Sequence, residues 1–243
     1  MLARSDIRMR YGRGALRAVK VLLDPFAALG VYLLLIAFVL DQSESAAGLS
    51  ITCAIIPFQL IMATMANALK SIEVRGSIIL NMSFPRMLIP VSSVVTESVA
   101  FSGSLVLIPA MMIAYGVAPT PALLWLPVAL AVTIVFAVAL CYPSALVGVW
   151  YPDLQPFAIS MVRALFFIAP GIVALDQISG TARDLLPFNP LTGLFESFRA
   201  AVLYGHSPAA WELLAPLAFA GLLAALTLPL YRREQPYLAK LVG

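Results

Sequence analysis

Long apolar stretches follow one another along almost the whole chain, and this pattern constrains the fold more than any other feature. Each of six stretches reaches the length of about 20 residues that a helix needs to cross the hydrocarbon layer of a bilayer. They are residues 21–40, 49–69, 87–115, 122–147, 156–175 and 210–230. Only 11% of the 243 residues are charged, whereas the share in soluble domains is about a quarter. The sequence therefore predicts one all-α membrane domain over residues 1–243, with six transmembrane helices.

Residues 1–20 precede the first apolar stretch and carry six basic side chains. These are Arg4, Arg8, Arg10, Arg13, Arg17 and Lys20. Several of them share one helical stripe while apolar side chains share another, a pattern typical of a helix that lies on the membrane surface. Signal peptides also begin with basic residues, but residues 21–40 are too long for the apolar core of one. We interpret them as an uncleaved first span behind an interfacial helix.

Residues 70–83 are more polar than the apolar stretches on either side of them. Polar residues recur there at helical spacing and predict a short helix on the cytosolic surface; they are Lys70, Glu73, Ser77 and Asn81. Pro85 ends this helix because proline lacks an amide donor. An ordinary polar loop is the alternative. Together with Asp153 and Gln155 of the next cytosolic loop, the helix offers a surface on which a cytosolic partner can act.

The distribution of lysine and arginine predicts the orientation in the membrane. With the N-terminus in the cytosol, thirteen of the fifteen basic residues fall on cytosolic segments, and only Arg183 and Arg199 fall outside. This is a strong positive-inside bias, so both termini are expected in the cytosol. The basic pI of about 9.0 then reflects topology and contact with anionic lipid. It gives no reason to expect a nucleic-acid partner.

The segment between the fifth and sixth stretches, residues 176–206, is too polar and interrupted to cross the membrane as one helix. We expect re-entrant or interfacial helices on the outer side. Asn189 is suited to cap a helix that ends at Gly205. Its apolar face comprises Leu191, Leu194, Phe195, Phe198 and Val202. Glu196 and Arg199 are expected off that face.

Catalytic motifs are not found in the sequence. The only histidine is His206, in a polar outer loop, so neither an HExxH motif nor a histidine cluster exists. No Walker A motif occurs, so the chain is not expected to hydrolyse nucleotide. Cys53 and Cys141 are isolated within apolar stretches and suggest neither a disulfide nor a thiolate metal site. A serine–histidine pair that uses His206 is the enzymatic alternative.

Two charged side chains within predicted spans are candidates for a substrate path. Glu97 lies about ten residues into the third span, where a carboxylate faces either a wet path or a hydrogen-bonding partner on another helix. Arg163 lies a few residues into the fifth span, where it either snorkels to the cytosolic surface or binds an anionic substrate group. Phe26, Tyr32 and Phe58 are aromatic candidates for stacking on sugar rings.

Several short motifs occur in an order and spacing that resemble a known family. They are Asp6-Ile7-Arg8-Met9-Arg10-Tyr11-Gly12-Arg13, Leu23-Asp24-Pro25, Ile56-Pro57-Phe58, Ile72-Glu73, Phe84-Pro85-Arg86, Tyr151-Pro152-Asp153-Leu154-Gln155, Asn189-Pro190-Leu191 with Glu196, Arg199 and Gly205, and Tyr231-Arg232. Together they resemble the membrane subunit of ATP-binding-cassette polysaccharide exporters over nearly the whole chain. Arg163 matches a basic position of the capsule-exporting branch, which the chain resembles most closely. The triplet Phe84-Pro85-Arg86 is nearer the O-antigen and teichoic-acid branches.

The resemblance implies a homodimer that forms a conduit for a lipid-linked polysaccharide, expected to be capsular, across the bacterial inner membrane. Two separate ATPase subunits, which hold ATP and Mg, would dock on the cytosolic side, so no cofactor is expected in this chain. A periplasmic or outer-membrane export complex is a further possible partner. An O-antigen or teichoic-acid exporter is the alternative, and so is a drug or lipid exporter of the same superfamily. A passive membrane scaffold that transports nothing is the third alternative.

The candidate site residues follow from these patterns and from the resemblance together. The resemblance implies that residues 70–83 form a coupling helix and residues 1–20 an interfacial gate helix. ATPase coupling is assigned to Lys70, Glu73, Arg75, Asp153 and Gln155. The gate and its interface are assigned to Arg8, Arg10, Arg13, Phe84, Pro85 and Arg86. The substrate path falls to Arg163, Glu97, Phe58, Phe26 and Tyr32. The segment 176–206 would form outer gating helices. We expect no catalytic residues and no metal-binding residues.

Overall fold

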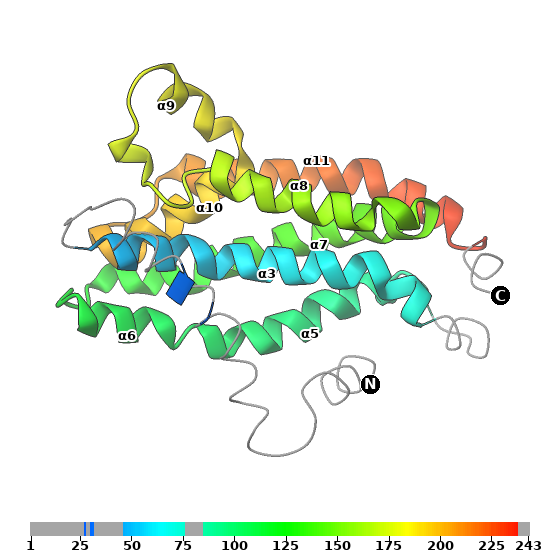
Figure 1. Ribbon diagram of the computed structural model, residues 1–243, viewed down its shortest axis with the longest axis horizontal. Helices are drawn as coiled ribbons and strands as arrows, with labels where there is room; N and C mark the ends of the chain where they lie inside the picture. Colours follow the sequence, from blue (N-terminus) through cyan, green and yellow to red (C-terminus); the bar gives the residue numbers. More distant parts are fainter. Residues whose placement is uncertain (1–26, 28–29, 32–45, 76–84, 238–243) are drawn as a thin grey trace, which may run out of the picture.

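Helices make up the fold of the computed structural model, which describes residues 27, 30, 31, 46–75 and 85–237 (Figure 1). The helices are α3 (Ala47–Val74), α5 (Leu88–Ser104), α6 (Leu107–Ala114), α7 (Leu126–Trp150), α8 (Gln155–Ile168), α9 (Thr181–Leu185), α10 (Pro190–Arg199) and α11 (Ala210–Glu234). Short 3₁₀ turns and one π turn, Ala200–Tyr204, connect them. The prediction of an all-α protein is confirmed for these residues. The predicted interfacial helix 1–20, most of the first span and residues 76–83 lie outside them.

Four of the six predicted spans correspond to helices that are long and apolar enough to cross a membrane. These are Ala47–Val74, Leu88–Ala114, Pro121–Trp150 and Ala210–Glu234. The second of them contains α5 and α6, which meet at a tight turn. Pro109 has no amide hydrogen for the carbonyl of Leu105, which instead accepts a hydrogen bond from the Ile108 amide at 3.2 Å.

The fifth predicted span, residues 156–175, is only partly helical. Its helix, α8, ends at Ile168 after 14 residues, and a helix of that length measures about 21 Å. Pro170 accounts for the end, because the residue before a proline is driven out of helical geometry, and Ala169 has extended backbone angles of −72° and 158°. The prediction of one continuous helix to residue 175 is therefore wrong.

The helix predicted between Asn189 and Gly205 is present as α10 and the π turn that follows it. The Asn189 side chain accepts a hydrogen bond from the Leu191 amide at 3.0 Å, as expected for a helix cap. Gly205 ends the turn with a left-handed φ of 69°, a conformation that favours glycine. Both predicted ends of this element are confirmed.

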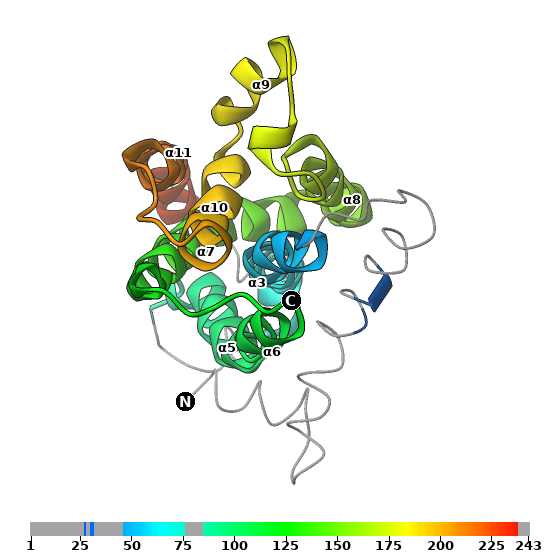
Figure 2. The same cartoon turned by 90° about the vertical axis from the view of Figure 1, so that its left-hand side faces the viewer.

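Helix α3 runs through the middle of the bundle, and α5, α7, α8 and α10 pack around it (Figures 1 and 2). Its side chains are buried on all sides, including Leu49, Ile56, Leu60 and Leu69. A helix that is apolar all round belongs in the interior. By contrast, α7 and α11 leave large apolar side chains exposed on their outer faces, as helices do that contact lipid.

Helices α7 and α3 approach closely where Gly148 faces Leu69. A Cβ atom built on Gly148 would lie 1.8 Å from the carbonyl oxygen of Leu69. No side chain fits in that space, so glycine at residue 148 sets the distance between the two central helices.

Candidate functional site

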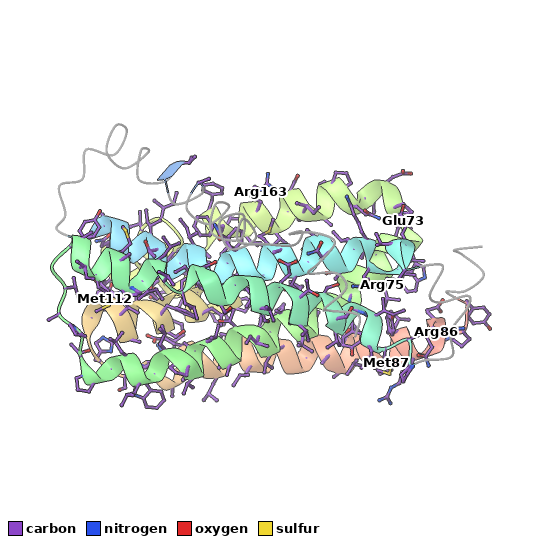
Figure 3. The ribbon with its side chains drawn as sticks, turned by 90° about the horizontal axis from the view of Figure 1, so that it is seen from below. Glu73, Arg75, Arg86, Met87, Met112 and Arg163 are labelled. Atoms are coloured by element: carbon purple, nitrogen blue, oxygen red, sulfur yellow. The ribbon has the colours of Figure 1, made fainter. Side chains whose placement is uncertain are left out.

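The predicted cytosolic segments gather at one end of the helical bundle, which we name the basic end. It consists of the C-terminus of α3, the first turn of α5, the junction between α7 and α8, and the C-terminus of α11 (Figures 1 and 3). Its described charged residues are Lys70, Glu73, Arg75, Arg86, Asp153, Arg232, Arg233 and Glu234. The opposite end contains the C-terminus of α6 together with α9 and α10 (Figure 1). Segments far apart in sequence thus form one surface.

Lys70 and Glu73 are exposed on the last turns of α3. This helix continues without a break through Val74, so the described part of the predicted surface helix 70–83 is the end of the second span. The prediction that a separate helix begins at residue 70 is wrong for these residues. The reason is local: no proline or glycine lies between residues 58 and 75, and Ile72 is still buried in the bundle.

Two members of the predicted coupling set are buried within the basic end. Arg75 is 7% exposed, and its Nη1 donates to the carbonyls of Ser71 and Ile89, each at 3.4 Å. Gln155 is 8% exposed, and its Nε2 donates to the Gly148 carbonyl near the end of α7 at 3.1 Å. Their side chains hold helices together. Lys70, Glu73 and Asp153 are the exposed members of the set.

Pro85 and Arg86, predicted to lie at the gate, form the turn that leads into α5. Pro85 is exposed and Arg86 is half-buried. Arg86 Nη1 donates to the carbonyl of Gln235, the C-cap residue of α11, at 2.7 Å. This turn is therefore bound to the end of α11. The remaining predicted gate residues, Arg8, Arg10, Arg13 and Phe84, lie outside the described residues.

Glu97, a predicted substrate-path residue, lies between α5 and α3. It is 3% exposed and its carboxylate accepts a hydrogen bond from the Asn67 side chain of α3. Polar side chains that link two membrane helices are usually placed in this way. Of the two interpretations of Glu97, the geometry favours the contact between helices over a wet path.

Phe58, another predicted substrate-path residue, belongs to an aromatic cluster inside the protomer. Its ring centroid lies 4.6 Å from that of Phe166 on α8 and 6.4 Å from that of Phe195 on α10. Phe58 is 8% exposed, so it packs these helices against α3. Phe26 and Tyr32 lie outside the described residues.

Arg163 is exposed on α8 (Figure 3). Its guanidinium forms no hydrogen bond or ion pair with any other described residue. Phe167, one helical turn further along, is 59% exposed. Of the predicted substrate-path residues in the described ranges, Arg163 is the one whose side chain is accessible.

A buried ion pair between Glu196 and Arg199 lies on α10, at the end of the bundle opposite the basic end. Arg199 is completely buried, and its Nη1 donates to Glu196 Oε1 at 2.7 Å and to the Pro170 carbonyl at 2.6 Å. Its Nη2 donates to the Gly171 carbonyl at 3.1 Å. Its Nε donates to Ser50 Oγ of α3 at 2.9 Å. We name these residues, Ser50, Pro170, Gly171, Glu196 and Arg199, the outer cluster.

The outer cluster satisfies backbone groups of the irregular residues that follow α8. Arg199 donates to the carbonyls of Pro170 and Gly171, and Glu196 Oε1 accepts the Leu175 amide at 3.1 Å. The prediction that Glu196 and Arg199 lie off the buried face of their helix is wrong, because every residue from Leu191 to Arg199 is buried. Their spacing of three residues is the sequence signal that points to an internal ion pair.

Tyr204 and His206 lie beside the outer cluster. Burial, with the nearby carboxylates of Glu196 and Asp176, raises the pKa of Tyr204 well above its ordinary value, so its hydroxyl stays protonated. The His206 ring is exposed and stacks on that of Tyr204, with centroids 5.8 Å apart. Among the residues that the structure describes, no three histidine, cysteine or acidic side chains are grouped as metal ligands.

The fold and its apolar surface define a multi-pass α-helical membrane protein. No protein-family model matches the chain. It is 29% identical over 207 residues to the O-antigen export system permease protein RfbA of Myxococcus xanthus, an alignment that covers 84% of this chain and 79% of that protein. Two permeases of the same name from Klebsiella pneumoniae are 22% and 21% identical and cover 84% and 92% of this chain. These two alignments cover 80% and 86% of the Klebsiella proteins.

The chain is therefore a distant homologue of O-antigen export permeases. The prediction of a transporter membrane subunit that is not an enzyme is confirmed by these relatives, each of which is the permease of an export system. The capsule-exporting branch is not among them. They agree better with the O-antigen alternative, to which the triplet Phe84-Pro85-Arg86 also pointed.

Proposed function

We propose that this chain is the permease subunit of an ATP-binding-cassette transporter that exports a lipid-linked polysaccharide of the O-antigen type across the bacterial inner membrane. The similarity to three O-antigen export permeases, over at least 84% of the chain, carries the proposal. The same similarity favours O-antigen export over the capsular export expected from the sequence. ATP hydrolysis would belong to a separate ATPase subunit.

The proposed topology has six spans, with the basic end in the cytosol. The charge distribution supports this orientation, because Lys70, Arg75, Arg86, Arg232 and Arg233 lie at that end. Residues 21–40 would form the first span. For the fifth, α8 would enter from the cytosolic side and the irregular residues after it would complete the crossing. Non-helical backbone is tolerated at membrane depth where it is buried and hydrogen-bonded, and the outer cluster meets both conditions.

We place the conduit between two copies of the chain, along the accessible face of α8. Phe157, Met161 and Phe167 are 62%, 57% and 59% exposed there. Arg163 lies on the same helix and would contact an anionic group of the passing substrate. A second protomer would close the face that one protomer leaves open.

The ATPase would dock on the exposed residues of the basic end, Lys70, Glu73 and Asp153. Lys70 and Glu73 end α3, the helix on which most of the bundle packs. Asp153 lies in the turn between α7 and α8. A subunit that binds both places contacts three helices at once, so its movement would reach the core of the bundle.

Charge reversal tests this docking surface. In the complex purified with its ATPase, Glu73→Lys combined with Asp153→Lys is expected to weaken ATPase retention at least about tenfold, because like charges across an interface cost several kcal/mol. Export should fall in parallel, measured as loss of the O-antigen ladder from lipopolysaccharide. Asp184→Lys, an exposed reversal in α9 at the opposite end, is the control and should retain the ATPase. Normal retention in the double variant would refute the docking assignment. A lost capsule with an intact ladder would refute the O-antigen assignment.

Arg163→Gln tests the conduit face. Arg163 has no described partner to lose, so assembly and thermal stability should stay within the range of about 0.5 kcal/mol that is typical of surface substitutions. The rate of polymer export should fall several-fold, because a charge-assisted contact with the substrate is removed. The measurement compares export rate with the amount of complex in the membrane, and Arg183→Gln, exposed in α9, is the matched control. An unchanged rate in Arg163→Gln would remove the arginine from the substrate path.

A further inference from the structure

Three hydrogen bonds join the turn that leads into α5 to α7 and α11 at the basic end. The Tyr231 hydroxyl of α11 donates to the Arg86 carbonyl at 3.2 Å, and the Tyr142 hydroxyl of α7 donates to the Met87 carbonyl at 3.4 Å. In return, the Arg86 guanidinium donates to the Gln235 carbonyl at 2.7 Å. We name this set, Arg86, Met87, Tyr142, Tyr231 and Gln235, the tyrosine clasp.

The two tyrosines of the clasp are buried and packed on each other. Tyr231 is 0% and Tyr142 8% exposed, and their rings meet edge to face with centroids 5.4 Å apart. A buried hydroxyl without a partner is costly, so the two backbone carbonyls fix where these rings can point. The Arg86 carbonyl also accepts the Ile89 amide at 3.1 Å, so both of its lone pairs are used.

The clasp connects the turn that leads into α5 with α11. Helix α5 packs along α3 and α7, whereas it hardly touches α11 elsewhere. The described chain resumes at Pro85 and enters the clasp at once. Arg75, at the end of α3, donates to the Ile89 carbonyl of α5 at 3.4 Å. The end of α3 that carries Lys70 and Glu73 is thus bound to the start of α5, and the residues just before α5 are bound to α11.

Helix α11 continues from the clasp to the opposite end of the bundle, where it packs closely on α10. A Cβ atom on Gly193 of α10 would lie 2.7 Å from the Glu212 carbonyl of α11. Helix α10 carries Glu196 and Arg199 of the outer cluster. A shift of α11 at the basic end would therefore reach the residues that hold the end of α8.

We propose that the tyrosine clasp passes movement of the end of α3 to α11, and that Tyr231 is the positioning residue of this connection. The inference rests on the proposed function, since it assumes that an ATPase docked on Lys70 and Glu73 moves the end of α3. Tyr231 acts through the Arg86 carbonyl and contacts neither polymer nor nucleotide. Loss of its hydroxyl would uncouple ATP hydrolysis from export, so that less polymer is exported for each ATP hydrolysed.

Tyr231→Phe tests this directly, because it removes one hydroxyl and keeps the ring. In the complex with its ATPase, we expect normal assembly and normal ATP hydrolysis, with polymer exported per ATP reduced about fivefold, the effect of one lost hydrogen bond on a coupling equilibrium. Tyr142→Phe combined with Tyr231→Phe should reduce this ratio further. Tyr115→Phe, exposed at the opposite end, is the matched control. An unchanged ratio in the double variant overturns the proposal, and so does a parallel loss of abundance, hydrolysis and export.

A rescue experiment checks the same connection with a different chemistry. In a chain whose Cys53 and Cys141 are replaced by alanine, Arg86→Cys with Gln235→Cys removes the guanidinium, and a flexible bis-maleimide restores a covalent link. The ratio of export to hydrolysis should be low before cross-linking and should recover after it. No recovery would contradict a clasp that moves as one body.

The clasp and the docking surface can fail separately. If Glu73→Lys with Asp153→Lys still retains the ATPase, the proposed docking fails and the clasp has no movement to pass on. If that variant loses the ATPase while the tyrosine variants keep a normal ratio of export to hydrolysis, the clasp alone is refuted.

Discussion

Replacing Gly148 by alanine is expected to destabilise the protein by about 3 kcal/mol or more, the upper range for overpacked cores. The added methyl carbon would lie 1.8 Å from the Leu69 carbonyl oxygen and within 2.9 Å of two other backbone atoms of that residue. Backbone atoms cannot rotate away as a side chain does, so α3 and α7 must separate. Because Gln155 also bonds the Gly148 carbonyl at 3.1 Å, the turn that carries Asp153 would shift with α7.

The control is Gly221→Ala, the same substitution at a glycine of α11. A Cβ atom there meets nothing within 4 Å, and alanine favours a helix over glycine by about 0.5–1 kcal/mol, so this variant should be as stable as the parent or slightly more stable. Thermal unfolding of the detergent-solubilised complex gives the comparison. Equal melting temperatures for the two variants would show that the α3–α7 contact is not as close as described.

Replacing Arg199 by methionine is expected to cost about 3–5 kcal/mol, the range for breaking a buried ion pair from one side. Glu196, only 6% exposed, would keep a charge without its cation, and the carbonyls of Pro170 and Gly171 would lose their donor. The irregular chain between α8 and α9 should loosen first. Limited proteolysis from the outer side should therefore cut residues 169–178 faster, and the melting temperature should fall.

Three further variants separate charge from packing in the outer cluster. Arg199→Met with Glu196→Gln should recover part of the stability, because no unpaired charge is then buried. Arg199→Lys should not recover it, since an ammonium cannot reach the partners that the planar guanidinium bonds on α3, α10 and the end of α8. Arg183→Met, exposed in α9, should change stability by less than about 0.5 kcal/mol. A small loss of stability in Arg199→Met would refute the structural importance of the cluster.

Much of the fold follows from residues that act locally. The caps of α10 illustrate this, because Asn189 bonds the next turn and Gly205 adopts a left-handed backbone that few other residues tolerate. The four apolar helices of spanning length illustrate it as well. In each case a short stretch of sequence carries the physical cause, so periodicity and composition are sufficient to predict the element.

The candidate site could be predicted only in part, since exposure depends on neighbours that are distant in sequence. Lys70, Glu73 and Asp153 are exposed as expected, whereas Arg75 and Gln155 are buried against α5 and α7. No pattern within residues 70–83 distinguishes Glu73 from Arg75, because the difference arises from where α5 begins. The same applies to Tyr231, whose partner lies 145 residues away.

The sequence by itself determined that this chain is a bundle of membrane helices and which end of the bundle carries most of the basic residues. It also determined the resemblance to polysaccharide exporters. The helical membrane bundle and its charged end depend on side-chain polarity along the chain, which a bilayer sorts without regard to tertiary contacts. The resemblance depends on the order and spacing of short motifs. Only the tertiary structure decided that Arg199 is buried and that the turn before α5 is bonded to α11. Each of these depends on whether a helix from elsewhere supplies the hydrogen-bonding partner, and a buried polar group is stable only where such a partner exists.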